Sequence, residues 1–91
     1  MSIKYMLTSI QNQLSNQLYH SLKEHFSDIE LVEVIENPFE RDSVWMRIIP
    51  PADSARSIQF GELAADMTTD ILVEHDCDIV ISFAKPSKAT H

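Results

Sequence analysis

Residues 74–78, with the sequence EHDCD, contain four kinds of side chain that proteins use as metal ligands. Zinc needs three or four ligands that converge on one point, and these usually come as two pairs far apart in the sequence. The chain lacks a second pair with such spacing, and adjacent ligands at the end of a helix point in different directions. We therefore interpret the run as a polar turn between a helix and a strand, and we expect no metal and no cofactor.

Cys77 lies inside this run, beside His75, and is a potential nucleophile. A reactive thiolate needs positive surroundings or the N-terminal end of a helix. Here Glu74, Asp76 and Asp78 surround the cysteine at the C-terminal end of a predicted helix, so both charge and helix dipole oppose the thiolate. We predict a small buried hydrophobic residue and no catalytic role.

A row of acidic residues occupies successive i, i+4 positions of the same predicted helix: Glu62, Asp66, Asp70 and Glu74. Like charges at this spacing repel one another slightly, and no Lys or Arg lies between Arg56 and Lys85 to offset them. Two interpretations stay open. The row is a solvated outer face, or it is an acidic docking strip for a partner protein with a basic surface.

The segment VIENPFERDSVWMRII, residues 34–49, predicts two strands joined by a turn, not an active-site loop. The strands are 30–36 and 43–49, both rich in β-branched residues. We expect a register that pairs opposite charges and stacks Trp on Ile. The expected pairs are Val34 with Met46, Glu33 with Arg47, Ile35 with Trp45, Val32 with Ile48, Leu31 with Ile49, and Glu36 with Val44.

Three further elements complete the predicted fold. Apolar residues recur at helical spacing over 3–26 and over 57–75, and 78–84 has the composition of a strand. Ser54 or Ser57 is the expected cap of the second helix. The sequence therefore predicts an α+β two-layer sandwich of order α-β-β-α-β, with a three-stranded mixed sheet and both helices on one face. We expect a single domain over residues 1–84 and a flexible tail over 85–91.

This arrangement leaves one sheet face without a covering element. The expected register directs one uniformly apolar face toward the helices: Val32, Val34, Val44, Met46, Ile48, Ile79, Ile81 and Phe83. The other face also carries apolar residues around the charged pair, and its central members form a predicted homodimer interface: Leu31, Glu33, Ile35, Trp45, Arg47 and Ile49. Val80 and Ala84 extend this face. The alternative is that the first helix covers Trp45.

Composition restricts the class of protein. The chain has 91 residues with fourteen acidic and seven basic side chains, for a formal charge of −7. This balance argues against direct nucleic-acid binding, which needs clustered Lys and Arg. No apolar run is long enough to predict a membrane span, and the first residues lack the pattern of a signal peptide. With a single cysteine and no intrachain disulfide, we expect a cytoplasmic protein.

The later part of the chain, ELAADMTTDILVEHDCDIVISF, resembles in layout the corresponding helix and strand of a nucleotidyltransferase core. That family has a Gly-Ser turn after its first strand and a spaced acidic pair on the next strand, and VIENPFERDSVWMRII has neither. We therefore expect a small, acidic, non-enzymatic protein–protein interaction or regulatory module. The alternative is a degenerate nucleotidyltransferase-like domain, or another nucleotide-binding domain without catalytic motifs.

Overall fold

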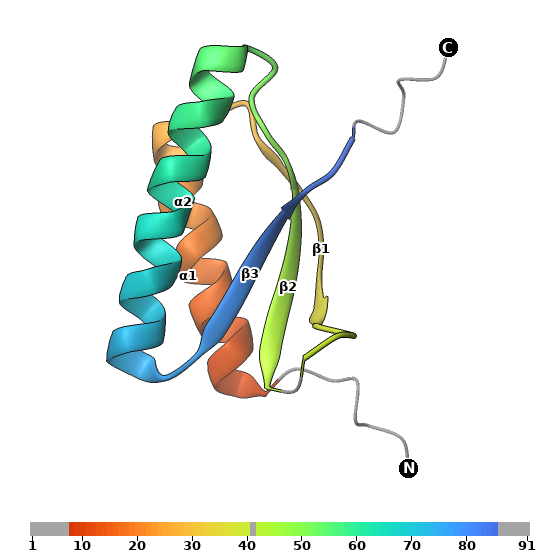
Figure 1. Cartoon of the computed structure of the whole chain (residues 1–91), viewed down its shortest axis with the longest axis vertical. Coiled ribbons are helices and arrows are strands. Elements are labelled where there is room, and N and C mark those ends of the chain that lie inside the picture. The colour runs from red at the N-terminus through yellow and green to blue at the C-terminus, as the bar shows by residue number, and fades with distance from the viewer. Residues whose placement is uncertain (1–7, 41, 86–91) are drawn as a thin grey trace.

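A computed structural model describes residues 8–40 and 42–85 (Figure 1). Its elements are α1 (Ser9–His25), β1 (Glu30–Glu36), β2 (Ser43–Ile49), α2 (Ser54–His75) and β3 (Asp78–Phe83). The predicted order α-β-β-α-β is confirmed. Of the predicted C-terminal tail, residues 86–91 lie outside the described part of the chain.

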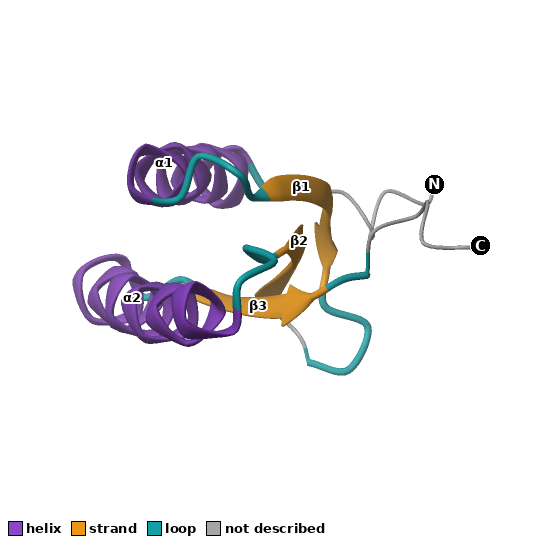
Figure 2. Ribbon diagram, turned by 90° about the horizontal axis from the view of Figure 1, so that it is seen from above, coloured by secondary structure: helices purple, strands orange, loops and turns teal. Residues whose placement is uncertain are grey.

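The three strands form one sheet in the order β1-β2-β3. β1 pairs with β2 in antiparallel orientation, and β3 runs parallel to β2. The parallel pair requires a crossover connection, which α2 provides. Both helices lie on the same side of the sheet (Figure 2), which confirms the predicted two-layer α+β fold.

Helix α1 begins where Thr8 caps it. The Thr8 hydroxyl accepts a hydrogen bond from the backbone N–H of Gln11, and the Gln11 side chain accepts one from the Thr8 N–H. This capping box satisfies two backbone donors that the first turn leaves free. The predicted helix started at residue 3, and residues 3–7 lie outside the described chain.

Helix α2 begins at Ser54, three residues before the predicted start. The expected caps Ser54 and Ser57 both lie inside the helix. Asp53 is the N-cap, and its carboxylate accepts a hydrogen bond of 3.0 Å from the backbone N–H of Arg56. The helix ends at His75, and its C-cap Asp76 adopts the left-handed conformation with a φ of 55°. Within residues 8–40 and 42–85, neither helix combines the length and the apolar character that a bilayer-crossing segment requires.

The core lies between the helices and the middle strand. Val44, Met46 and Ile48 of β2 are fully buried under both helices. Phe26, after α1, meets Phe60 of α2 edge to face, with ring centroids 5.6 Å apart. Residues that join them in the buried cluster include Leu14, Leu18, Leu22, Ile29, Ala64 and Ile79. Each element therefore contributes apolar residues to a single core, although Val32 and Phe83, both predicted to face the helices, are 46 % and 50 % exposed.

The hairpin register is confirmed near the turn and wrong at the open end of β1. Glu33, Val34, Ile35 and Glu36 pair as predicted with Arg47, Met46, Trp45 and Val44. Beyond them the register shifts, so that Leu31 pairs with Ile48 and Glu30 with Ile49. Val32 is the extra residue of this β-bulge and is 46 % exposed. Leu31 consequently packs against the core instead of lying on the open face.

Candidate protein-interaction surface

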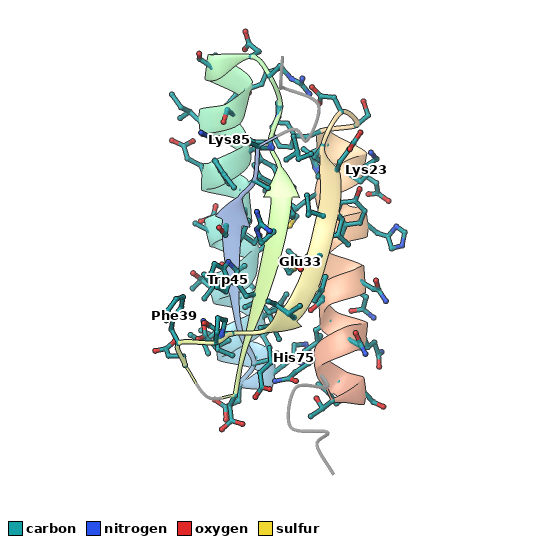
Figure 3. The ribbon with its side chains drawn as sticks, turned by 90° about the vertical axis from the view of Figure 1, so that its right-hand side faces the viewer. Lys23, Glu33, Phe39, Trp45, His75 and Lys85 are labelled. Carbon is teal, nitrogen blue, oxygen red and sulfur yellow. The ribbon has the colours of Figure 1, made fainter. Side chains whose placement is uncertain are left out.

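The sheet face opposite the helices is centred on Trp45 of β2 (Figure 3). Because side chains alternate along a strand, the burial of Val44 and Met46 beneath the helices sends Trp45 and Arg47 to this open face. Ile35 of β1 and Val80 of β3 are the direct neighbours of Trp45 in the sheet, and they are 36 % and 39 % exposed. We call this surface the open face.

The hairpin turn adds a second aromatic ring to the open face. Phe39 is 82 % exposed, and its ring centroid lies 5.5 Å from that of Trp45. The Asn37 side chain holds the turn by accepting a hydrogen bond of 2.9 Å from the Phe39 N–H. The sequence prediction treated this segment only as a connection and missed Phe39. An aromatic residue in a polar turn was the available signal.

The indole N–H of Trp45 is buried, and it has no hydrogen-bond acceptor among residues 8–40 and 42–85. A buried donor without an acceptor costs about 1–3 kcal/mol of desolvation. Within the described part of the chain, this N–H is therefore a polar group left unsatisfied. Phe39 lies beside the indole ring on a solvent-exposed turn.

Glu33 and Arg47 form the charged part of the open face. Their side chains make a salt bridge of 3.0 Å across β1 and β2, and each remains about two-fifths exposed, at 39 % and 40 %. An ion pair this exposed contributes little to the stability of the single chain. Its groups remain available for contacts with a second molecule.

The predicted interface set changes in composition. Leu31 leaves it because the bulge directs it to the core, whereas Phe39 joins it. Ile49 is partly buried at the end of β2, and Ala84, expected on this face, is buried beyond the end of β3. The alternative expectation that α1 covers Trp45 is wrong, because α1 lies with α2 on the other side of the sheet (Figure 2).

The acidic strip lies in the helix layer, on the opposite side of the sheet. Glu62, Asp66, Asp70 and Glu74 are all exposed. Asp70 and Glu74 also line a shallow groove of about 250 Å³ between α1 and α2. The two salt bridges among the described residues, Glu33–Arg47 and Asp28–Arg56, leave all four carboxylates unpaired by Lys or Arg within that part of the chain. The two predicted surfaces are therefore separate.

The residues of the EHDCD run occupy different structural positions in the turn between α2 and β3. His75 is the last residue of α2, Asp76 is its left-handed cap, Cys77 is buried, and Asp78 begins β3. In residues 8–40 and 42–85, no three His, Cys, Asp or Glu side chains are grouped so that they could hold a metal ion. Burial raises the pKa of the Cys77 thiol, and the carboxylates of Asp78 and Asp76 raise it further.

Comparison of the chain with protein-family models, with curated proteins and with solved structures gave no match in any of the three.

Proposed function

We propose that this protein is a small non-enzymatic interaction module that forms a homodimer through its open face. The observation that carries the proposal is a sheet face that no described element covers. It has two adjacent aromatic rings, Trp45 and the highly exposed Phe39, flanked by exposed Ile35 and Val80. Interface centres are enriched in aromatic residues and Arg, surrounded by polar groups that exclude water. With its single cysteine, the module is proposed to act in the cytoplasm.

Charge favours a second copy as the occupant of this face. The chain carries a formal charge of −7, so most contacts between two copies are repulsive. The centre of the open face is different, because its charges are the balanced pair of Glu33 and Arg47. A twofold axis through this face allows Arg47 of each copy to approach Glu33 of the other. Contact through this surface therefore adds less local repulsion than contact through the acidic surfaces.

The test is the mass of the protein in sedimentation equilibrium. Trp45→Ala and, separately, Ile35→Glu should halve the mass of the assembly without loss of helix content by circular dichroism. The matched control for Ile35→Glu is Val73→Glu. It introduces the same charge at another exposed apolar residue, which lies on α2 and outside the core. It should leave the mass unchanged. A wild-type protein that is monomeric at high concentration, or an open-face variant of unchanged mass, would contradict the proposal.

The acidic strip supports a second candidate role, the docking of a partner protein with a basic surface. Its four carboxylates are exposed along one ridge of α2 and have no Lys or Arg salt-bridge partner in the described chain. Charge complementarity of this kind affects association rates and specificity more than affinity. A dimer joined by its open faces would present two such strips outward.

The order of the elements supports the alternative, a degenerate nucleotidyltransferase-like or other nucleotide-binding domain. The Gly-Ser turn and the spaced acidic pair that such enzymes use remain missing from residues 34–49. We therefore rank this alternative below the interaction module, and a thermal-shift screen of nucleotides and divalent cations distinguishes the two.

A further inference from the structure

The two edges of the sheet are protected to very different degrees. β1 and β3 are the edge strands. β1 carries Glu30, Glu33 and Glu36 and contains the bulge at Val32, and both charges and bulges prevent another strand from pairing with an edge. β3 has a regular register with β2, and after Asp78 it contains only apolar residues and Ser82. The edge of β3 is therefore suited to receive another strand.

The backbone groups that β3 offers at this edge can be identified. Ala84 donates its N–H to the Ile48 carbonyl, so even-numbered residues of this parallel strand bond to β2. Successive residues of a strand direct their backbone groups to opposite sides. The N–H and C=O groups of Ile79, Ile81 and Phe83 consequently point to the free edge.

A row of uncharged residues on α2 runs beside this edge. Its members follow one another at spacings of three and four: Ile58, Gly61, Ala65, Thr68 and Leu72. Gly61, Ala65 and Thr68 line a groove of about 410 Å³ together with residues of β3. The two ends of the row, Ile58 and Leu72, belong to the apolar pattern that predicts this helix, but they are 65 % and 44 % exposed. We call this row the α2 stripe.

Among residues 8–40 and 42–85, no backbone conformation or close contact requires glycine at position 61. It lies in the interior of α2, where glycine is an unfavourable helix residue. A Cβ at this position would lie 3.7 Å from Cζ of Phe83, an ordinary van der Waals contact. The monomer therefore has room for alanine. A second helix could pack closely against the stripe only if position 61 has no side chain.

We propose that two copies of this protein pair through β3 in antiparallel orientation, which extends the sheet in the order β1-β2-β3-β3-β2-β1 and packs α2 against α2. This surface is distinct from the open face, so the inference goes beyond the proposed function. α2 lies level with β3 at the side of the molecule (Figure 2), so the pairing brings the two α2 helices close together. Small residues in the stripe allow that approach.

In the proposed pair, one twofold axis relates both the two β3 strands and the two α2 helices. A twofold axis beside Ile81 pairs Ile81 with its own copy and Ile79 with Phe83, which bonds every outward-facing backbone group of β3 while keeping like faces together. Gly61 lies next to Phe83. α2 runs antiparallel to β3, so moving from Gly61 to Ala65 on the helix corresponds to moving from Phe83 back to Ile81 on the strand. The four helix residues cover about 6 Å and the two strand residues about 6.6 Å, which places Ala65 beside Ile81.

The α2 stripe has its own centre at Ala65. Ile58 and Leu72 each lie seven residues from Ala65 in opposite directions. An antiparallel pair of α2 helices centred there places each exposed Ile58 against Leu72 of the other copy, with small residues between them. The two large exposed side chains of the stripe thus find partners of matching type.

Charge predicts how this contact responds to salt. Glu62 and Asp66 follow the stripe residues Gly61 and Ala65 on the outer side of α2, and the pairing brings them near the same residues of the second copy. Screening weakens repulsion between exposed charges. Association through β3 should therefore strengthen several-fold between low and high salt.

The two proposed contacts are compatible with one closed assembly. The axis through the β3 edge is perpendicular to the sheet, whereas the axis that pairs two open faces lies parallel to it. Two perpendicular twofold axes that intersect generate a tetramer with closed symmetry. The wild-type protein should then sediment as a tetramer.

The experiment combines sedimentation equilibrium with amide hydrogen exchange. Ala65→Leu places a bulky side chain at the centre of the α2 stripe, and its matched control is Ala55→Leu, an exposed position on the same helix outside the stripe. Ala65→Leu should halve the mass and remove exchange protection from the amides of Ile79, Ile81 and Phe83. Ala55→Leu should change neither. Gly61→Ala, which the monomer accommodates, should weaken the assembly while leaving helix content intact.

The result separates this inference from the proposed function. Ala65→Leu with unchanged mass and unchanged protection of the three amides would overturn pairing through β3, whether or not Trp45→Ala reduces the mass. Halving by Ala65→Leu together with no effect of Trp45→Ala would support the β3 contact and contradict the open-face dimer. Combining the two substitutions should give a monomer, and a wild-type monomer at high concentration would contradict both.

Discussion

Cys77 and Trp45 are residues whose chemistry depends on what surrounds them. Cys77 lies in a buried position at the junction of α2 and β3, between two aspartates. Trp45 lies on the open face next to a phenylalanine that the turn supplies. In the first case burial and negative charge suppress a reactive group. At Trp45, the surrounding residues of the same chain leave a large aromatic side chain only partly covered.

The raised pKa of the Cys77 thiol predicts low reactivity and a loss of stability at alkaline pH. Folding favours the neutral thiol, so this contribution to stability is fully present below the pKa of the unfolded thiol, about 8.5. It is lost as the pH rises through the higher pKa of the folded state. At pH 8, iodoacetamide should modify the folded protein several-fold more slowly than the urea-unfolded chain.

The control for this prediction is Cys77→Ala, whose unfolding free energy should fall less steeply than that of the wild type between pH 8 and 10. Because other groups titrate in the same range, the difference between the two proteins is the measured quantity. Equal alkylation rates for the folded and unfolded chains would show that the thiol is neither buried nor suppressed.

At the level of elements, α2 combines three different surfaces on one helix. Its inner side packs Phe60 and Ala64 into the core. The α2 stripe runs beside β3, and the acidic strip extends from the outer side toward α1. The strip is locally unfavourable, because each successive pair of carboxylates at i, i+4 repels.

Charge reversal within the strip tests whether it has a role beyond solvation. In the double variant Asp66→Lys with Asp70→Lys, the pairs with Glu62 and Glu74 become attractive, and only the pair between the two new lysines remains repulsive. The variant should be more stable than the wild type by roughly 1 kcal/mol in urea unfolding at low salt. The gain should decrease at high salt.

Binding of a lysine-rich probe peptide provides the functional half of this test. The wild type should bind the peptide in a salt-dependent manner, and the double variant should bind it weakly with little salt dependence. Reversing Asp28 in place of the strip residues is the control, since this carboxylate is separate from the strip and already paired with Arg56. Unchanged peptide binding together with raised stability would identify the strip as a solvated face only.

For the whole molecule, the competing classes of function differ in what should stabilise the fold. A nucleotide-binding domain gains stability from its ligand, because a ligand that binds only the folded state raises the melting temperature. An interaction module gains stability from its own concentration through assembly. The two behaviours are distinguishable in the same instrument.

A thermal-shift screen should find no increase in melting temperature with ATP, GTP, CTP or UTP, in the presence or absence of Mg²⁺, Mn²⁺ or Zn²⁺. Raising the protein concentration tenfold should increase the melting temperature, and this increase should be smaller for Trp45→Ala. Sodium chloride at matched ionic strength is the control for nonspecific charge effects. A reproducible shift with one nucleotide would favour the nucleotide-binding alternative over the interaction module.

Much of the architecture follows from patterns within short stretches of the sequence. Both strands of the hairpin occupy the predicted ranges, and the pairs from Glu33 to Glu36 are those expected from charge and aromatic matching. The parallel strand also presents the expected residues to the helices, with Ile79 and Ile81 opposite Val44 and Met46. These features are local, because the alternation of a strand and the periodicity of a helix depend on neighbouring residues.

The remaining features were decided by tertiary structure. The bulge at Val32 interrupts an alternation that is regular in the sequence, and it sends Leu31 into the core. Ile58 and Leu72 have helical spacing from core residues, but the position of α2 over β3 leaves them exposed. Phe39 reaches Trp45 only because the turn folds beside it. Such outcomes depend on which surfaces meet across the whole fold, and the sequence pattern of a single element contains no information about where its neighbours end.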